Sequence, residues 1–553
     1  MPATPAPRIA PAAAGPGPEP LLLLLWLAAV TLALTGLGHV PLRDWDEAIA
    51  SRVALELSQA RGMAQLLPTF WGEPYLNKPP GLHLLMAAVI QLWRLLGGNA
   101  PDALPPEAVI RLAPALLSTL VVPLGGMIAR QLRPGDRLTP VATAAILLTL
   151  LPIARHGRMA MLDGSQLSAI ALLWWALLRS RSAGCSILGS SVVAGLAGSA
   201  LLLLKAPMLL PVLAAGLLGL LLDPERPRRL WPPLALGLVL GLIPGVGWHL
   251  FHLVSRGGSA LHLWIGDGAG RVLLDAGEGS RMGWRLPLLE LLKGGWPWLP
   301  LWPFGLAMAW RERHLSSGRW PLVLQGVMAA SILPLRTQLP WYSHPLWLPF
   351  ALICAPALVW LVRGPGAGTS APPMAWLLRR LPLFWGVLGA SLLVGGLLLS
   401  TPTGMAAGTA LLPYRPFLLS SGGGWLLGAI ALMAPRRRWR LAGATLLGAA
   451  TGFTLLLLML SPLWNWELAE QWPVRPVAAM VRLHRAGPVL IRGGNTRPSL
   501  SWYAGQPIRR LRGRKRTAQP PTWLLSRDDA PVRGAGSCVA VDHAAGWQLL
   551  RCR

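Results

Sequence analysis

Long apolar runs recur along this chain and constrain its fold more than any other feature. Residues 21–40 supply about the number of apolar residues that an α-helix needs to cross the hydrocarbon core of a bilayer, and similar runs follow along most of the sequence. Hydrophobic residues make up 53% of the 553 positions and charged residues 13%, which excludes a string of soluble domains. Because unpaired backbone groups are costly in lipid, we predict an all-α polytopic membrane protein.

The segment before the first apolar run, residues 1–20, is rich in Pro and Ala and is predicted to be a disordered cytoplasmic leader. A cleaved signal peptide has a short apolar region followed by a small-residue cleavage site. Here the run is full length and ends in charged residues. We therefore interpret residues 21–40 as an uncleaved first helix.

Basic residues outnumber acidic ones by 50 to 22, for a net charge of +28. Most arginines lie in short segments between apolar runs, as the preference for positive charge on the cytoplasmic side predicts, and this distribution argues against nucleic-acid binding. Six clusters are predicted to be cytoplasmic: Arg130/Arg133/Arg137, Arg179/Arg181, Arg226/Arg228/Arg229, Arg311/Arg313/Arg319, Arg363/Arg379/Arg380 and Arg436/Arg437/Arg438/Arg440.

Residues 81–98 decide the topology. The stretch is short for a span and carries His83, Gln91 and Arg94, so we predict a helix along the outer interface; a crossing here would put all six clusters outside. Several of the resulting spans are shorter than a crossing needs and are predicted to be broken helices that line a cavity. The thirteen predicted spans lie near residues 21–40, 108–129, 139–153, 163–178, 185–204, 207–222, 230–254, 286–309, 320–335, 342–362, 381–400, 413–434 and 441–462.

Residues 21–462 thus form the predicted membrane domain, with outer loops at 41–107 and 255–285, and residues 463–553 form a small extracytoplasmic α/β domain. In that domain SLSWYAGQPIRRL, TWLLSRDD and CVAVDHAAGWQLLRC are predicted to be strand segments with turns. Cys538 and Cys552 flank a predicted hairpin, and whether they form a disulfide stays open. Cys185 and Cys354 lie in apolar runs and are predicted to be inert packing residues.

Acidic residues come directly after the first apolar run, at Asp44, Asp46 and Glu47. Taken alone, they fit a solvated junction between helix and loop. Lys78 is predicted on the same outer side, and this chain uses Lys only four times among fifty basic residues. A compact ammonium suits a phosphate partner, although snorkelling to lipid headgroups is the simpler alternative.

Further charged groups are predicted to reach the same outer surface. Asp163 begins a span directly after Arg155 and Arg158. A helix N-cap is the ordinary role of such an Asp, but an ionisable group at membrane depth is also a candidate functional residue. The other candidates are Lys205 at the end of an apolar run, Asp267, Arg271 and Asp275 in the loop 255–285, and Arg336, Gln338, Tyr342 and His344 at the start of a later span.

Carboxylates and cations that meet in a cleft at membrane level suit a lipid-linked phosphate substrate. Cations hold the leaving phosphate, while a carboxylate accepts the proton of an attacking hydroxyl or amine. Direct displacement at a sugar anomeric carbon passes through an oxocarbenium-like state and inverts that centre. The sequence has no Walker A or Rossmann motif, and no step of this chemistry requires ATP.

Several motifs follow one another along the chain: DWDEAIASR, YLNKPPGLHLL, Arg111, RMAMLDGSQLSA, LLLLKAPMLLP, GWPWLPLWP and QLPWYSHPLWLP. As a set and in this order they resemble the motifs of the GT-C glycosyltransferases, in particular the PMT-like group of families 39 and 83. That group includes the protein O-mannosyltransferases and the bacterial aminoarabinose lipid A transferase, which the chain resembles most. Each motif is weak alone, and the match covers the membrane body to about residue 350; PSLSWYAGQPI also resembles a periplasmic segment of the lipid A transferase.

The resemblance implies roles for the acidic residues. Asp46 is the expected catalytic acid or base, Glu47 its neighbour in an acceptor or metal site, and Asp163 the second essential carboxylate. Whether these three hold a divalent metal ion stays open. The resemblance implies a phosphate contact for Lys78, and the other predicted substrate contacts are Arg111, Arg155, Arg158, Lys205, Arg271, Arg336, Tyr342 and His344.

The sequence departs from the family pattern at two places. Many relatives have KxKLPxY where this chain reads RTQLPWY, so Arg336 stands at the first cation and Gln338 replaces the second. We expect this change to alter either the phosphate contact at that point or the donor head group. Asn77 stands where some relatives have an acid before the Lys, which weakens any case for bound zinc.

The expected activity is transfer of a sugar from a polyprenyl-phosphate donor to an extracytoplasmic lipid or protein, with inversion, in the plasma (inner) membrane. The alternative is a transporter or flippase of lipid-linked sugars, but such a protein is expected to show an internal repeat and a path through the midplane, and we find no repeat. A structural scaffold gives no reason for acids and cations to converge. The sugar, the acceptor and the oligomeric state are not encoded in any local motif.

Overall fold

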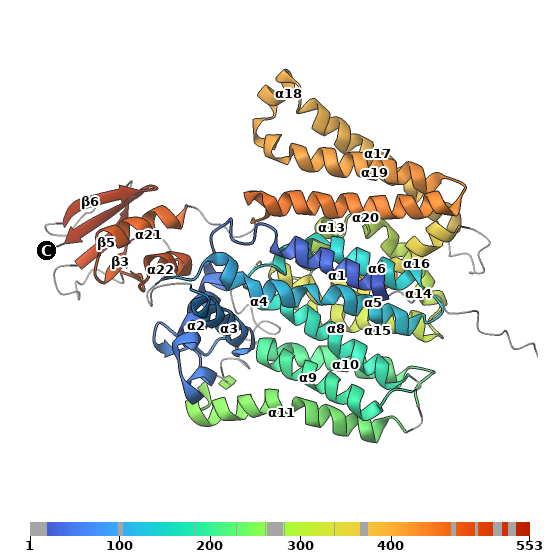
Figure 1. Cartoon of the computed structure of the whole chain (residues 1–553), viewed down its shortest axis with the longest axis horizontal. Helices are drawn as coiled ribbons and strands as arrows, with labels where there is room; N and C mark the ends of the chain where they lie inside the picture. Colours follow the sequence, from blue (N-terminus) through green and yellow to red (C-terminus); the bar gives the residue numbers. More distant parts are fainter. Residues whose placement is uncertain are drawn as a thin grey trace, which may run out of the picture.

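The computed structural model describes most of the chain. The described residues are 19–97, 103–182, 184–227, 229–259, 261–262, 280, 282–336, 338–364, 374–465, 472–492, 496–511, 522–528 and 538–552. A helical body makes up the larger part, and a small sheet domain lies at one end of it (Figure 1).

The helical body takes its helices from two stretches of the chain, one before and one after residues 257–284. The first contains α1 (Glu19–Leu34), α4 (Glu107–Thr119), α5 (Val121–Leu132), α6 (Leu138–Thr149), α7 (Leu151–His156), α8 (Leu162–Ser180), α9 (Ile187–Lys205), α10 (Leu209–Leu221) and α11 (Trp231–Arg256). The second contains α13 (Arg285–Gly294), α14 (Trp302–Arg311), α15 (Ser316–Ile332), α16 (His344–Arg363), α17 (Ala375–Leu398), α18 (Pro402–Ala407), α19 (Arg415–Met433) and α20 (Arg437–Leu460). Short helical turns join several of them: η3 (Ala206–Met208), η4 (Leu299–Leu301), η5 (Pro340–Ser343), η6 (Thr409–Tyr414) and η7 (Pro462–Trp464).

Helices long and apolar enough to cross a membrane confirm the predicted class. Each of the thirteen predicted spans contains at least one helix, whereas the number of crossings stays a prediction. In the part of the chain that the structure describes, seven segments meet both criteria of length and composition: Glu107–Leu132, Ile187–Leu221, Trp231–Arg256, Pro340–Arg363, Ala375–Leu398, Thr409–Met433 and Arg437–Leu460.

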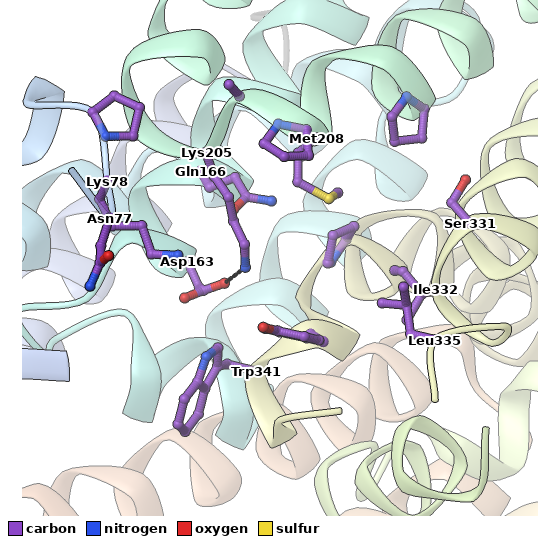
Figure 2. A pocket seen from close by; sticks show the side chains of 16 residues that line it. Asn77, Lys78, Asp163, Gln166, Lys205, Met208, Ser331, Ile332, Leu335 and Trp341 are labelled. Atoms are coloured by element: carbon purple, nitrogen blue, oxygen red, sulfur yellow. Dashed lines mark hydrogen bonds and ion pairs between the residues drawn. The ribbon is translucent and has the colours of Figure 1, made fainter. Parts of the chain in front are cut away.

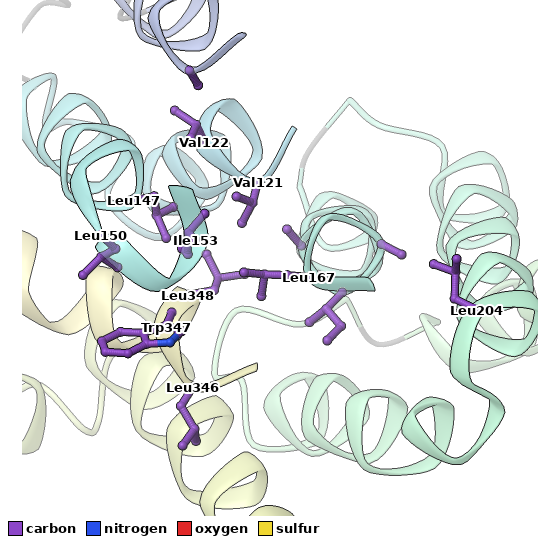
Figure 3. Close-up of a cluster of buried hydrophobic side chains, with 14 of the residues drawn as sticks. Val121, Val122, Leu147, Leu150, Ile153, Leu167, Leu204, Leu346, Trp347 and Leu348 are labelled. Atoms are coloured by element: carbon purple, nitrogen blue, oxygen red, sulfur yellow. The ribbon is translucent and has the colours of Figure 1, made fainter. Parts of the chain in front are cut away.

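The segment that contains α16 lies at the centre of the body. Its most apolar stretch is 94% buried, against 28% for the segment that forms α11. Figure 3 shows Trp347 and Leu348 of α16 among Leu147 and Leu150 from the α6 region. Because lipid tails are as apolar as these side chains, close packing rather than removal of water holds such helices together. The α16 segment also supplies one wall of the site described below.

One short predicted span, residues 139–153, is broken in the structure. Leu150 has an extended backbone with φ −76° and ψ 116°, which ends α6. Pro152 then stands in the first turn of α7, where a missing N–H costs nothing. The break leads the chain through α7 and a turn into the start of α8, where Asp163 lies.

The segment between α1 and α4 covers the end of the body that is nearest the sheet domain (Figure 1). Exposed apolar side chains on α3, among them Leu92 and Leu95, fit the interfacial position predicted for this stretch. Helix α3 packs against both α2 and α4. The elements of the segment are η1 (Asp44–Ala48), α2 (Ile49–Gln59), η2 (Gly62–Leu66), β1 (Thr69–Phe70), β2 (Glu73–Pro74) and α3 (Gly81–Leu95).

The C-terminal domain is α/β, as predicted. Its five strands have the order β4-β3-β5-β7-β6, with β3 parallel to β4 and β5 and the other pairs antiparallel. A disulfide joins Cys538 and Cys552 across the β6–β7 hairpin, which answers the question that the sequence left open. Its elements are α21 (Val474–Leu483), β3 (Val489–Ile491), α22 (Pro498–Ala504), β4 (Arg509–Arg510), β5 (Thr522–Arg527), β6 (Cys538–Ala544) and β7 (Trp547–Cys552).

The prediction of a strand for SLSWYAGQPIRRL was wrong for its first half. Residues Pro498–Ala504 form α22, and only Arg509–Arg510 pair as a strand. Pro498 fits the first turn of a helix, and Gly505 ends it in the left-handed conformation at φ 73°. These two signals outweigh the alternation of apolar and polar residues that favoured a strand.

Candidate active site

A pocket of about 250 Å³ opens where α8, α9, α15 and α16 meet the loop before α3 (Figure 2). One part of its wall is polar and the other is apolar, with Met208, Ile332 and Leu335 on the apolar side. The complete lining is Asn77, Lys78, Pro79, Asp163, Gln166, Lys205, Ala206, Pro207, Met208, Pro211, Ser331, Ile332, Leu335, Trp341, Tyr342 and Pro345. Four of these residues were predicted from the sequence, and the fold brings them together: Lys78, Asp163, Lys205 and Tyr342.

Two lysines reach toward one carboxylate in this pocket. Lys205 Nζ donates a hydrogen bond to Asp163 Oδ1 at 3.1 Å, and Figure 2 shows Lys78 directed at the same carboxylate from the opposite side. The Lys205 ammonium also lies 4.3 Å from the centre of the Tyr342 ring, within the range of a cation–π contact. Two cations around one carboxylate leave positive charge available for an anionic group.

Asp46 lies beside these groups, in the helical turn η1. Its carboxyl is half-buried, and burial raises the pKa of Asp46 from 3.8 to about 7. The nearby charge of Asp163 adds to this increase, while the ammonium groups of Lys78 and Lys205 oppose it. A carboxyl with a pKa near neutrality, next to cations in a pocket, is a typical candidate for a general base.

Glu47, the next residue, lies in a different environment. Its carboxylate is fully buried and forms two hydrogen bonds with Arg111, from Nε and Nη2, each at 2.7 Å. The backbone amides of Arg43 and Ala160 donate to the same two oxygens. Burial alone raises the pKa of Glu47, but the Arg111 charge and these hydrogen bonds hold it below its usual value. With four N–H donors on two oxygens, Glu47 fixes the fold around Asp46.

Arg111 was predicted to contact the substrate, whereas the structure buries it completely under the loop that carries Asp46. Besides Glu47, its guanidinium bonds the backbone carbonyls of Leu37, Val40 and Pro41. Through these hydrogen bonds the several N–H groups of the planar guanidinium hold the segment that follows α1. Arg111 therefore has a structural position, away from the pocket lining.

Arg155, Arg158 and His344, three further predicted substrate contacts, are also buried. Arg155 donates from Nε to the Trp464 carbonyl at 2.7 Å, and Arg158 lies 4.5 Å from the Trp464 ring centre. His344 contacts His156, with their ring nitrogens 3.0 Å apart. These three side chains contact other protein groups and are not among the residues that line the pocket.

The remaining candidates lie at the edge of the site or outside the described residues. Arg336 is exposed, directly after Leu335 of the pocket wall. Gln338 is buried and donates to the backbone carbonyls of Ile332 and Leu335, so it shapes the end of α15. Arg271, with Asp267 and Asp275, lies outside the described residues.

Among the residues that the structure describes, no group of three or more His, Cys, Asp or Glu side chains is placed to hold a metal ion. Asp46, Glu47 and Asp163 were the candidates, and four N–H donors already occupy the two oxygens of Glu47. Lys205 in addition engages Asp163, which favours an anion rather than a cation as the occupant of this pocket.

Sequence reasoning missed part of the pocket lining. Gln166 follows Asp163 by one helical turn on α8, and that spacing was a readable signal that both face the same side. Ser331 and Ile332, near the end of α15, gave no such signal, because their contact with the pocket depends on how α15 packs against α16.

Comparison with known proteins supports the fold through structure alone. No protein-family model matches the chain, and no curated protein matches it by sequence. The structure resembles ArnT from Cupriavidus metallidurans bound to undecaprenyl phosphate, with a TM-score of 0.72 and 17% identity over 96% of this chain and 98% of that one. The chain has the GT-C fold.

Two further structures share this GT-C fold. ArnT from the same organism in the apo state gives a TM-score of 0.67 with 16% identity, again over 96% of this chain and 98% of that one. Arabinofuranosyltransferase AftD from Mycobacteria gives 0.50 with 12% identity, over 97% of this chain but 40% of that one. These matches confirm the predicted fold class and its resemblance to ArnT.

Proposed function

We propose that this chain is a membrane glycosyltransferase that moves a sugar from a polyprenyl-phosphate donor to an extracytoplasmic lipid or protein acceptor. The observation that carries the proposal is the meeting of Lys78, Lys205 and Asp163 in one pocket, with Asp46 beside it. The match to ArnT bound to undecaprenyl phosphate supports the same class of carrier.

The two parts of the pocket wall suit the two parts of such a donor. Lys78 and Lys205 supply charge-assisted hydrogen bonds for the phosphate. Met208 and Ile332 provide an apolar surface for the first isoprene units of the carrier. Asp163 orients Lys205 through their ion pair and keeps two neighbouring cations from repelling each other.

The reaction is a displacement at the sugar anomeric carbon. A hydroxyl or amine of the acceptor forms the new bond to that carbon, the bond from carbon to phosphate oxygen breaks, and its electron pair stays on the phosphate. The acceptor proton passes to Asp46, whose pKa of about 7 lets it accept a proton at neutral pH. A single displacement inverts the anomeric centre.

The extracytoplasmic location of the site is part of the proposal. The Cys538–Cys552 disulfide supports it, because disulfides persist in oxidising compartments and are rare in the cytosol. The C-terminal domain and the α2–α3 segment lie at the same end of the helical body, so one orientation accounts for both (Figure 1). Location in the plasma (inner) membrane is part of the same proposal.

The test is transfer of radiolabelled sugar from polyprenyl-phosphate donors extracted from cells, with the full chain purified in detergent. The wild type is compared with Asp46→Asn and with Asp528→Asn, a matched change at an exposed acid of the C-terminal domain. We expect transfer by the wild type and Asp528→Asn but not by Asp46→Asn. Separate analysis of lipid and protein products identifies the acceptor class.

Two results would contradict the proposal. Full activity of Asp46→Asn would remove this residue as the base. Absence of any product from folded wild type, together with movement of the lipid-linked sugar across vesicle membranes, would favour the transporter alternative.

A further inference from the structure

The loop that carries Asp46 is held by the C-terminal domain as well as by the membrane body. Asp44, two residues before Asp46, is buried and accepts a hydrogen bond from Arg497 Nε at 2.7 Å. The backbone N–H of Ser499 lies 3.3 Å from Asp44 Oδ1, and the Ser499 hydroxyl donates to the same oxygen. Asp44 therefore belongs to an interface between the two domains.

A second contact secures the same loop from α22. Tyr503 Oη accepts the backbone N–H of Leu42 at 2.8 Å and donates to Glu107 Oε1 at 2.7 Å. Arg475 of α21 forms an ion pair with the same glutamate. The segment from Leu42 to Asp44 thus receives partners from α22 and from Arg497, the residue before it, in addition to the contacts that Arg111 makes nearby.

Arg497 is itself fixed within its own domain. It is buried, donates to the Trp472 carbonyl, and lies 4.7 Å from the centre of the Trp472 ring. Trp472 in turn packs against Trp547 of β7, with ring centroids 4.8 Å apart. A guanidinium held in this way presents its N–H groups in one direction, which is the requirement for positioning a partner within a few tenths of an ångström.

We infer that Arg497, aided by Ser499 and Tyr503, is a positioning residue for Asp46, so that the C-terminal domain completes the active site. This inference rests on the proposed function. Asp46 lies between two anchors: Asp44, held by the C-terminal domain, and Glu47, held by Arg111. Small displacements of a reacting group cost large factors in rate, so releasing one anchor should lower turnover without removing the phosphate-binding lysines.

The Asp44–Arg497 ion pair has a simpler explanation. It could serve only to hold the two domains together. Such pairs add little net stability because both charges lose their hydration, but they do fix geometry. The two explanations differ in what they predict. A mere connection changes the amount of folded protein, whereas a positioning contact changes kcat and local order around Asp46 at constant carrier binding.

The experiment uses the full chain with Arg497→Met, which keeps the apolar stem, and Arg497→Lys, which keeps the charge but loses the fork. His484→Ala is the control, because it breaks the 2.8 Å His484–Asp542 contact within the same domain. Four quantities are measured: kcat, KM for the lipid donor, the Kd of undecaprenyl phosphate, and hydrogen–deuterium exchange of the amides of residues 42–48.

We expect Arg497→Met to lower kcat roughly 10- to 100-fold while the Kd of undecaprenyl phosphate changes less than about twofold. Exchange in residues 42–48 should become faster, Arg497→Lys should recover part of kcat, and His484→Ala should behave as wild type. If Arg497→Met fails to fold, Tyr503→Phe takes its place, because it removes both hydrogen bonds of the hydroxyl and keeps the ring. An unchanged kcat, or equal losses of kcat and carrier binding, would overturn the inference.

Failure of the proposed function gives a different pattern. In that case the wild type transfers no sugar, and the exchange measurement alone decides the inference. Faster exchange of residues 42–48 in Arg497→Met supports it, and unchanged exchange overturns it.

Discussion

Glu47 and Arg111 form a bidentate ion pair that is fully buried, and both N–O distances are 2.7 Å. The neighbouring Asp46 is half-buried beside a pocket with two lysines. Two adjacent acids therefore lie in different environments: Glu47 holds the loop in place, and Asp46 is the residue that we propose as the proton acceptor. This difference leads to opposite expectations for their variants.

Glu47→Gln should reduce the amount and stability of folded protein. Removing one charge from a buried pair leaves the other uncompensated, at a cost of roughly 3–5 kcal/mol. The measurement is thermal unfolding in detergent, followed by size-exclusion chromatography. Glu73→Gln, at an exposed position of β2, is the matched control. Wild-type stability of Glu47→Gln would show that the pair does not hold this loop.

Transfer by the wild type should increase with pH through about 7. The ionised carboxylate is the proton acceptor, and half of the Asp46 population is ionised at its pKa of about 7. The check is the rate of single-turnover transfer between pH 5 and pH 9, with saturating donor. A rate that is flat across this range would mean that Asp46 does not titrate in the rate-determining step.

Asp46→Asn should fold normally and become more stable than the wild type at alkaline pH. The folded-state pKa of Asp46 is raised above its ordinary 3.8, so its contribution to stability is present below 3.8 and is lost as pH rises through about 7. The amide cannot ionise and escapes this loss. Unfolding temperatures of the two proteins should agree near pH 4 and separate by pH 8; a constant difference contradicts the assignment.

Lys78→Met and Lys205→Met should each weaken binding of undecaprenyl phosphate. A hydrogen bond to a charged group contributes about 1.5–3 kcal/mol, which corresponds to roughly a 10- to 100-fold change in Kd. Lys293→Met serves as control, because that lysine is 61% exposed and pairs with Glu290 outside the pocket lining. Binding by fluorescence quenching at two salt concentrations distinguishes phosphate contact from general surface charge. Equal affinities for all three variants would exclude the pocket as the phosphate site.

Replacing both Cys538 and Cys552 by Ala should destabilise the β6–β7 hairpin. The two cysteines are 14 residues apart, and closing a loop of about 15 residues stabilises a fold by roughly 3 kcal/mol. Amide exchange in β6 and β7 reports the change, with Cys185→Ala, at a free cysteine, as the control. Exchange as slow as in the wild type would mean that strand pairing alone holds the hairpin.

Part of the site was readable from the sequence because its signals are local. Lys78, Asp163 and Lys205 each interrupt or border an apolar run. A charged side chain at membrane depth is a candidate functional residue whatever the tertiary structure around it. The same rule also selected Arg155, Arg158 and His344, which the fold turns toward protein partners. Position along a helix identifies depth in the membrane but not the direction in which a side chain points.

The sequence by itself determined that this is a helical membrane protein with a C-terminal α/β domain, because apolar length and arginine placement are properties of short segments. Only the tertiary structure decided the different environments of Asp46 and Glu47, since the environment of Glu47 depends on Arg111, 64 residues away. It also brought Arg497 to Asp44 across 453 residues. Contacts at such separations follow from how whole helices and domains pack, and no local pattern records them.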